Sequence, residues 1–208
     1  MHPNPEANMT APLDFYFDFS SPYGYLAAMR INELAASYGR HVNWHPILLG
    51  VVFKATGAVP LSTIPIKGPY ALHDIDRTAR FHGIPFKFPA SFPISTQATA
   101  RAMLFIHDTH GAERAVEFAT AAYQKYFVDG INIGDPENVL RIVADMGLDP
   151  AVISEAINST PIKEQLKSEI EHAMARGVFG APFIFLDGEP FWGFDRFDQI
   201  EAMLKNGK

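Results

Sequence analysis

The sequence predicts an α/β fold in which a large all-helical segment separates a β-α-β unit from a C-terminal hairpin and helix. Three observations lead to this class. Apolar residues alternate at period two near the N-terminus, and a short continuous apolar run that ends at a turn signal lies near the C-terminus; both patterns are typical of strands. In the middle of the chain they recur at helical spacing. With 208 residues, 48% of them hydrophobic and 19% charged, the chain is able to bury a substantial core and is not wholly disordered.

The predicted β-α-β unit occupies the N-terminal part of the chain. Residues 13–19 alternate aromatic and acidic side chains, which indicates a strand. Ser21-Pro22 indicates a helix start, with serine as the N-cap and proline at the first helical position, and Gly39 marks the helix end. Residues 42–47 indicate a second strand. Because a helix connects the two strands, we expect them to pair in parallel.

The middle of the chain is predicted to be helical. It opens with an irregular loop region at residues 50–68, which is rich in Gly, Pro and Thr. Apolar stripes at helical spacing follow. Two Asp-Pro pairs place a capping acid before a proline at the first helical position, and so predict two helix starts. These pairs are Asp135-Pro136 and Asp149-Pro150.

The last quarter of the chain returns to strands. An apolar run at residues 182–186 ends at Asp187-Gly188, a pair typical of a tight hairpin turn. Residues 189–192 are expected to form the returning strand. Residues 195–204 repeat apolar side chains at helical spacing and predict a closing helix.

Composition and charge exclude several function classes. The chain has 17 Lys and Arg against 23 Asp and Glu, a net charge of −6, so we expect no nucleic-acid partner. The absence of cysteine excludes disulfides, thiolate metal sites and a cysteine nucleophile. His107 and His110 have no nearby third ligand, so no metal site is expected. No stretch approaches the ~18 apolar residues that span a bilayer, and no targeting signal is visible, which favours the cytoplasm.

Three short segments are candidates for chemistry. The Ser21 hydroxyl lies at a helix N-terminus, where it can help to stabilise an anion such as a thiolate; a plain N-cap is the alternative. A cis Ala181-Pro182 bond leaves the amide and carbonyl of Ala181 available to a peptide ligand, and an ordinary trans proline is the alternative. Asp195 either accepts a ligand ammonium, oriented by Arg196, or only caps the closing helix.

The chain resembles the DsbA-like branch of the thioredoxin superfamily, in which a helical domain is inserted into a thioredoxin-like fold. Within that branch it is most similar to 2-hydroxychromene-2-carboxylate isomerases and kappa-class glutathione transferases. Four segments carry the resemblance: FYFDFSSPY at residues 15–23, GIPF at 83–86, GVFGAP at 177–182 and FWGFDR at 191–196. With this resemblance we divide the chain into a disordered tail at residues 1–12, a thioredoxin-like domain of residues 13–49 and 176–208, and a helical insertion domain of residues 50–175.

The resemblance also implies a glutathione site. The family's serine at the position of Ser21 hydrogen-bonds the glutathione sulfur and favours its thiolate, so the sulfur arrives with the cofactor. The backbone of Ala181 pairs with the cysteinyl unit, and Pro182 is cis. Asp195 matches the acid that receives the γ-glutamyl amino group, next to Arg196.

A second part of the site is implied by a Lys-x-x-Tyr-x-x-x-Asp pattern. Lys67, Tyr70 and Asp74 match it at the start of the helical region. Lys67 is expected to anchor a carboxylate of glutathione or of the substrate, and Asp74 to reach the γ-glutamyl group. The alternative is a solvated helix face.

The resemblance implies a glutathione-dependent isomerase of a small aromatic carboxylate, working as a homodimer. A kappa-type transferase that consumes glutathione and a non-catalytic DsbA-like binding protein are the alternatives. A set of aromatic residues either lines a pocket for a flat substrate or belongs to the core. These are Phe17, Tyr23, Trp44, Phe53 and Trp192.

Overall fold

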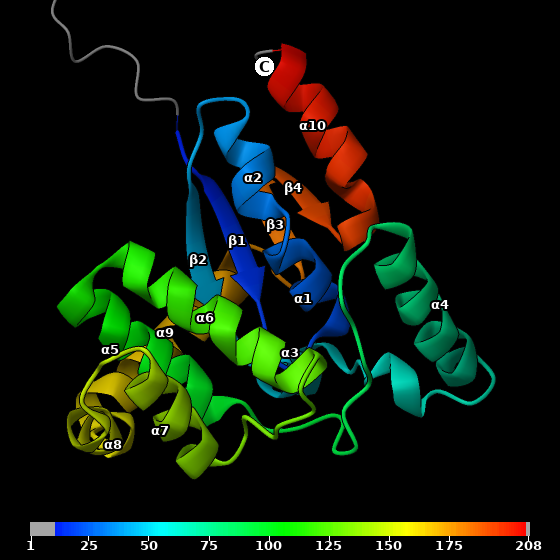
Figure 1. Ribbon diagram of the computed structural model, residues 1–208. Coiled ribbons are helices and arrows are strands. Elements are labelled where there is room, and N and C mark those ends of the chain that lie inside the picture. Colours follow the sequence, from blue (N-terminus) through cyan, green and yellow to red (C-terminus); the bar gives the residue numbers. More distant parts are fainter. Residues whose placement is uncertain (1–10, 207–208) are drawn as a thin grey trace, which may run out of the picture.

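The computed structural model describes residues 11–206 and contains, within that range, one four-stranded sheet with helices around it (Figure 1). Most of the predicted tail, residues 1–10, lies outside the described residues, as do residues 207–208. The strand order is β2-β1-β3-β4. The strands are β1 (Leu13–Phe17), β2 (Val42–Pro46), β3 (Phe183–Leu186) and β4 (Glu189–Trp192).

The pairing of the strands confirms the predicted topology. β1 pairs with β2 in parallel, and β3 pairs with β1 and β4 in antiparallel fashion. The hairpin between β3 and β4 turns at Asp187-Gly188, where both residues have positive φ values of 51° and 88°. Such turns match the right-handed twist of the strands, which explains why this dipeptide predicted a hairpin.

Between β1 and β2 the chain forms two short helices, α1 (Pro22–Ala28) and α2 (Ile31–Ala36), rather than one. Ser21 is the N-cap of α1 with Pro22 at its first position, as predicted. The predicted loop at residues 50–68 is partly wrong, because α3 (Leu49–Thr56) and a 3-10 turn, η1 (Leu61–Thr63), form there. Val52 is buried and Gly57 closes α3 with a φ of 75°, so tertiary packing overrides the loop-like composition.

The helical insertion follows between β2 and β3. The side chains of Asp135 and Asp149 accept hydrogen bonds from backbone N–H groups in the next turn, which confirms both predicted caps. Beyond α3, its α-helices are α4 (Lys67–Phe81), α5 (Gln97–His110), α6 (Ala112–Phe127), α7 (Pro136–Asp145), α8 (Pro150–Asn158) and α9 (Thr160–Ala175). A second 3-10 turn, η2 (Phe194–Arg196), and α10 (Phe197–Asn206) follow the hairpin.

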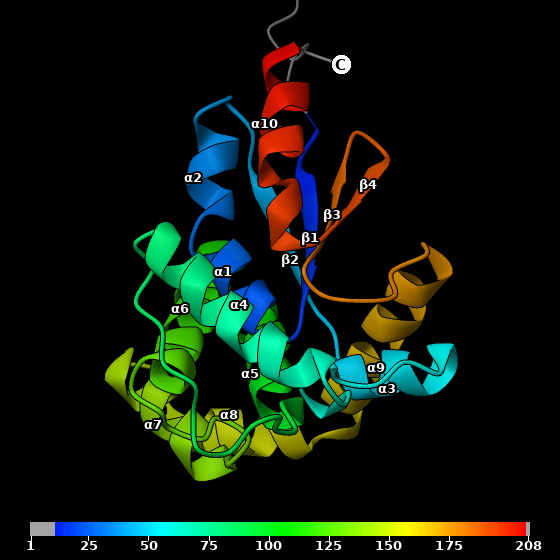
Figure 2. The ribbon, with the colours of Figure 1, turned by 90° about the vertical axis from the view of Figure 1, so that its right-hand side faces the viewer.

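The helices fall into two groups around the sheet. Both ribbon views show α5 to α8 gathered at one end of the molecule, with α10 near the opposite end (Figures 1 and 2). α4 stands apart from that group in Figure 1, and it contacts η1 and α1. Three α4 residues, Ala71, Leu72 and Ile75, line the cavity described below.

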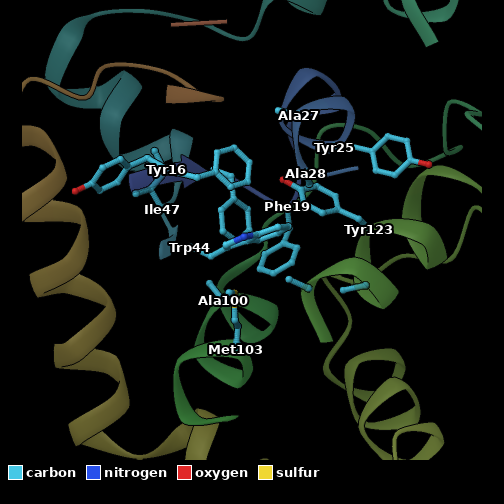
Figure 3. Packing of buried hydrophobic residues seen from close by; sticks show 14 of the residues in the cluster. Tyr16, Phe19, Tyr25, Ala27, Ala28, Trp44, Ile47, Ala100, Met103 and Tyr123 are labelled. Atoms are coloured by element: carbon cyan, nitrogen blue, oxygen red, sulfur yellow. The ribbon is translucent and has the colours of Figure 1, made fainter. Parts of the chain in front are cut away.

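One aromatic cluster joins the sheet to the insertion. Trp44 on β2 packs edge-on against Phe15 and Phe17, with ring centroids 5.0 and 5.3 Å apart. Tyr123 of α6 lies 5.2 Å from Phe19, beyond the end of β1 (Figure 3). The sheet and the insertion therefore share a single hydrophobic core, and their division into domains stays a prediction.

Candidate active site

A cavity of about 740 Å³ lies where the β1–α1 turn, α3, α4 and the segment before β3 meet. This volume falls in the range of small-molecule sites. Most of the side chains that line it are apolar, including Phe53, Ile64 and Ile75. Ser21 and Ala181 line it too, so residues 160 positions apart in sequence meet at its wall.

Ser21 has its hydrogen bonds satisfied within the chain. Its Oγ accepts a hydrogen bond from the Gly24 N–H at 3.0 Å and donates one to the Ala181 carbonyl at 3.1 Å. The side chain is 5% exposed. Because a hydroxyl has one proton, Ser21 can donate to a ligand only by turning away from the Ala181 oxygen.

The Ala181-Pro182 peptide bond is cis, as the resemblance implied. The Pro182 carbonyl accepts a hydrogen bond from the Gly193 N–H at 3.0 Å, which ties the entrance of β3 to the end of β4. Ala181 is half-buried at the cavity wall. The pairing of its backbone with an extended ligand stays a prediction.

Beneath the serine lies Asp18, to which the sequence assigned no role. It is 4% exposed, and its carboxylate accepts hydrogen bonds from Ser20 N–H, Leu49 N–H and Thr96 Oγ1 at 2.7, 2.6 and 2.9 Å. Burial raises the pKa of Asp18, although these hydrogen bonds oppose the shift. Asp18 thereby joins the turn before Ser21 to α3 and α5, contacts that a local sequence pattern cannot reveal.

Tyr23 links the first helix to α4. Its hydroxyl donates to the carboxylate of Asp74 at 2.6 Å, and Asp74 also forms an ion pair with Arg77, whose guanidinium donates to the Tyr70 hydroxyl at 3.2 Å. Burial, reinforced by the hydrogen bond to Asp74 and by the charge of Asp195, raises the pKa of Tyr23. Asp74 therefore has two partners within the chain, and its predicted role toward a ligand stays a prediction.

The other predicted ligand-binding residues lie outside the lining of the cavity. Lys67 is exposed at the first position of α4. The Asp195 side chain is 72% exposed and pairs with Arg196 at 3.0 Å. The charge of Asp195 acts on Tyr23, which places it near the Tyr23–Asp74 pair. The structure thus brings Ser21 to the backbone of Ala181 but does not bring Lys67, Asp195 or Arg196 into the cavity wall.

The predicted aromatic set divides between the core and the cavity. Phe17 and Trp44 are buried core residues. Tyr23, Phe53 and Trp192 line the cavity. The core interpretation is therefore confirmed for Phe17 and Trp44. A flat substrate as the occupant of the cavity stays a prediction.

Two features are absent from residues 11–206. Within residues 11–206, no group of three or more His, Cys, Asp or Glu side chains is arranged to hold a metal ion. Over the same range, no helix combines the length and the apolar character needed to cross a bilayer.

The fold and the site define a thioredoxin-type protein that has a serine and no cysteine at its first helix. The family model of the DSBA-like thioredoxin domain matches residues 12–205. Three curated proteins named 2-hydroxychromene-2-carboxylate isomerase are 31–34% identical to the chain. The one from Sphingobium xenophagum is 34% identical over 198 residues, which cover 94% of this chain and 99% of that protein.

Two further similarities agree with this result. The solved structure of a 2-hydroxychromene-2-carboxylate isomerase superposes with a TM-score of 0.84 at 29% identity, covering 93% of this chain and 94% of that one. Glutathione S-transferase kappa 1 of Caenorhabditis elegans is 26% identical over 204 residues, which cover 93% of this chain and 90% of that protein. The chain belongs to the DsbA-like thioredoxin family and, within it, to the 2-hydroxychromene-2-carboxylate isomerase family.

Proposed function

We propose that this protein is a glutathione-dependent isomerase that interconverts 2-hydroxychromene-2-carboxylate and trans-o-hydroxybenzylidenepyruvate, or closely similar aromatic acids. The observation that carries the proposal is the meeting of the Ser21 hydroxyl and the Ala181 backbone at the wall of an apolar cavity. The names of the isomerase relatives support the reaction, and those of the kappa transferases support the cofactor.

The residues present fit a tripeptide thiol. The chain has no cysteine, so a thiol must come from a ligand. Ser21 offers a hydroxyl donor, and the half-buried backbone of Ala181 offers an amide and a carbonyl to an extended peptide. When bound, glutathione would supply a thiolate that adds reversibly to the conjugated double bond of the ring-opened substrate, in which the hemiketal C–O bond has broken to give a phenol and a ketone. The former double bond can then rotate before the thiolate is eliminated.

The protein's own residues have three tasks in this reaction. Ser21 turns its proton from the Ala181 carbonyl to the ligand sulfur and so favours the anion. The Ala181 carbonyl is then free to accept an amide proton of the ligand. The apolar wall excludes water and holds the aromatic part of the substrate.

The proposal is tested by following the conversion of 2-hydroxychromene-2-carboxylate by absorbance, with and without glutathione. We expect turnover that requires glutathione and falls in Ser21→Ala. Glutathione-independent turnover at the same rate contradicts the proposal, as does the absence of turnover with glutathione present.

A kappa-type transferase is the second candidate, favoured by the kappa relatives. It differs in the fate of glutathione, which a transferase joins covalently to an electrophile. Mass spectrometry of the products separates the two activities. A non-catalytic binding role is excluded by turnover of either kind.

Two further expectations accompany this proposal. We propose a homodimer, which light scattering coupled to gel filtration tests through the molar mass. We also propose a cytoplasmic location, which cell fractionation tests.

A further inference from the structure

Two large aromatic rings are exposed at the mouth of the cavity. Trp192 is 54% exposed and Phe179 is 45% exposed, although both line the cavity. Their ring centroids are 4.9 Å apart in an edge-to-face arrangement. An exposed apolar pair beside a cavity is costly in water and is typical of a surface that binds a ligand.

The indole of Trp192 is seated on the backbone of Gly180. A Cβ atom at position 180 would lie 2.5 Å from Trp192 Nε1 and 3.2 Å from Cε2, so only glycine permits this approach. Gly180 directly precedes Ala181, whose carbonyl accepts the Ser21 hydrogen bond. The indole therefore packs against the residue that precedes the carbonyl hydrogen-bonded to Ser21.

The charge of the cavity wall favours one orientation of an aromatic acid. Among the described residues that line the cavity there is no Lys, Arg or His, and Asp18 is the one ionisable carboxylate. A substrate carboxylate finds no cation inside, whereas its ring finds an apolar wall. The ring is therefore expected to lie inward and the carboxylate toward the mouth and the solvent.

We propose that Trp192, supported by Phe179 and seated on Gly180, is a specificity-determining residue that stacks on the planar ring of the aromatic acid and directs its carboxylate to the cavity mouth. The identity of the ligand, an aromatic acid, rests on the proposed function. The contact with Trp192 rests on the exposure of Trp192 and Phe179 beside the cavity and on the packing of the indole against Gly180.

The chain is well suited to a fluorescence test, because it has two tryptophans. Trp44 is 8% exposed, and its indole N–H donates to Asn32 at 3.0 Å within the core. Trp192 is the exposed one. A probe that quenches the emission of the wild type but not that of Trp192→Leu therefore reports contact at Trp192.

The probe is trans-2-hydroxycinnamate, added to the protein without glutathione. We expect saturable quenching in the wild type. Calorimetric titration is expected to give a Kd that rises about two- to twelvefold in Trp192→Leu, the range that corresponds to one aromatic contact. Phe81→Leu is the matched control, since Phe81 is 83% exposed but lies outside the cavity lining, and its Kd should stay unchanged.

Gly180→Ala tests the geometry without removing an aromatic ring. The new Cβ must displace the indole, so we expect weaker probe binding in Gly180→Ala alone. In the Trp192→Leu background, the same change should have little additional effect, because the clashing ring is gone. Equal effects of Gly180→Ala in the two backgrounds overturn the coupling.

Steady-state kinetics distinguish a failure of this inference from a failure of the proposed function. If glutathione-dependent isomerisation occurs, Trp192→Leu should raise KM with kcat nearly unchanged, as for a contact made equally in the ground and transition states.

Isomerisation with an unchanged KM and no quenching overturns the role of Trp192 and leaves the proposed function intact. Quenching and weaker binding in Trp192→Leu without any isomerisation support the aromatic contact and contradict the proposed function. A Trp192 emission maximum that shifts with protein concentration, and does not respond to the probe, assigns Trp192 to a contact between copies. That result also overturns the inference.

Discussion

Replacement of Ser21 by alanine has two separable consequences that follow from its two hydrogen bonds. The first concerns the fold. Ser21→Ala removes the bond that caps α1, from the Gly24 N–H at 3.0 Å, and such a loss costs about 1 kcal/mol of unfolding free energy. For a chain of this length that corresponds to a fall in Tm of about 2–4 °C.

The second consequence concerns the bound thiol. A hydrogen bond to a charged group contributes about 1.5–3 kcal/mol, and each pKa unit corresponds to about 1.4 kcal/mol. If Ser21 donates to the thiolate, then Ser21→Ala should raise the pKa of the bound thiol by about one to two units. The variant then needs a more alkaline solution than the wild type to form the same fraction of thiolate.

The assay is a pH titration of the complex with glutathione, followed by the ultraviolet absorbance of the thiolate. Ser20→Ala is the matched control, since Ser20 also lines the cavity and its Oγ accepts a bond from the Ile94 N–H at 3.1 Å. We expect a shifted thiol pKa in Ser21→Ala and none in Ser20→Ala. An unchanged pKa in Ser21→Ala, or equal shifts in both variants, refutes the reasoning.

Three further predictions concern stability and local opening of the fold. Asp18→Asn places an amide donor against backbone N–H groups and should cost about 1–3 kcal/mol in urea unfolding, whereas exposed Asp76→Asn should cost almost nothing. Tyr23→Phe removes the 2.6 Å bond to Asp74, so amide hydrogen exchange should become faster in α4 and stay unchanged in α6. A hydrogen bond from His45 lowers the pKa of Glu169, so this group stabilises the fold above its unfolded pKa of about 4.3 and loses that effect as pH falls through its lower folded value. Urea midpoints should therefore converge between wild type and Glu169→Gln on acidification, and a constant difference contradicts the assignment.

Local signals in the sequence were sufficient for much of the fold. Ser21-Pro22, Asp135-Pro136, Asp149-Pro150 and Asp187-Gly188 each combine residues whose backbone preferences agree with the element that forms. These motifs act over a few residues, and the structure confirms all four. Parallel pairing of β1 and β2 followed from the helical connection between them.

Tertiary contacts account for what the sequence did not predict. α3 begins a segment whose Gly and Pro residues lie mainly after it, at residues 57–68, and burial of Val52 stabilises its first part as a helix. Asp18 receives hydrogen bonds from Leu49 and Thr96, 31 and 78 positions away, so no local pattern identifies it. Lys67 and Asp74 both lie on α4, but the partners of Asp74, Arg77 and Tyr23, do not follow from the Lys-x-x-Tyr-x-x-x-Asp pattern.

The central claim is that glutathione acts as a cofactor in an isomerisation, and a mass balance tests it most directly. The protein is supplied with 2-hydroxychromene-2-carboxylate in large excess over glutathione, and substrate, product and free glutathione are quantified by mass spectrometry. We predict that the reaction proceeds to its equilibrium mixture, with each glutathione molecule used many times and all of it recovered unchanged. A reaction that stops once the glutathione has been consumed into a conjugate, or one that proceeds equally well without glutathione, contradicts the claim.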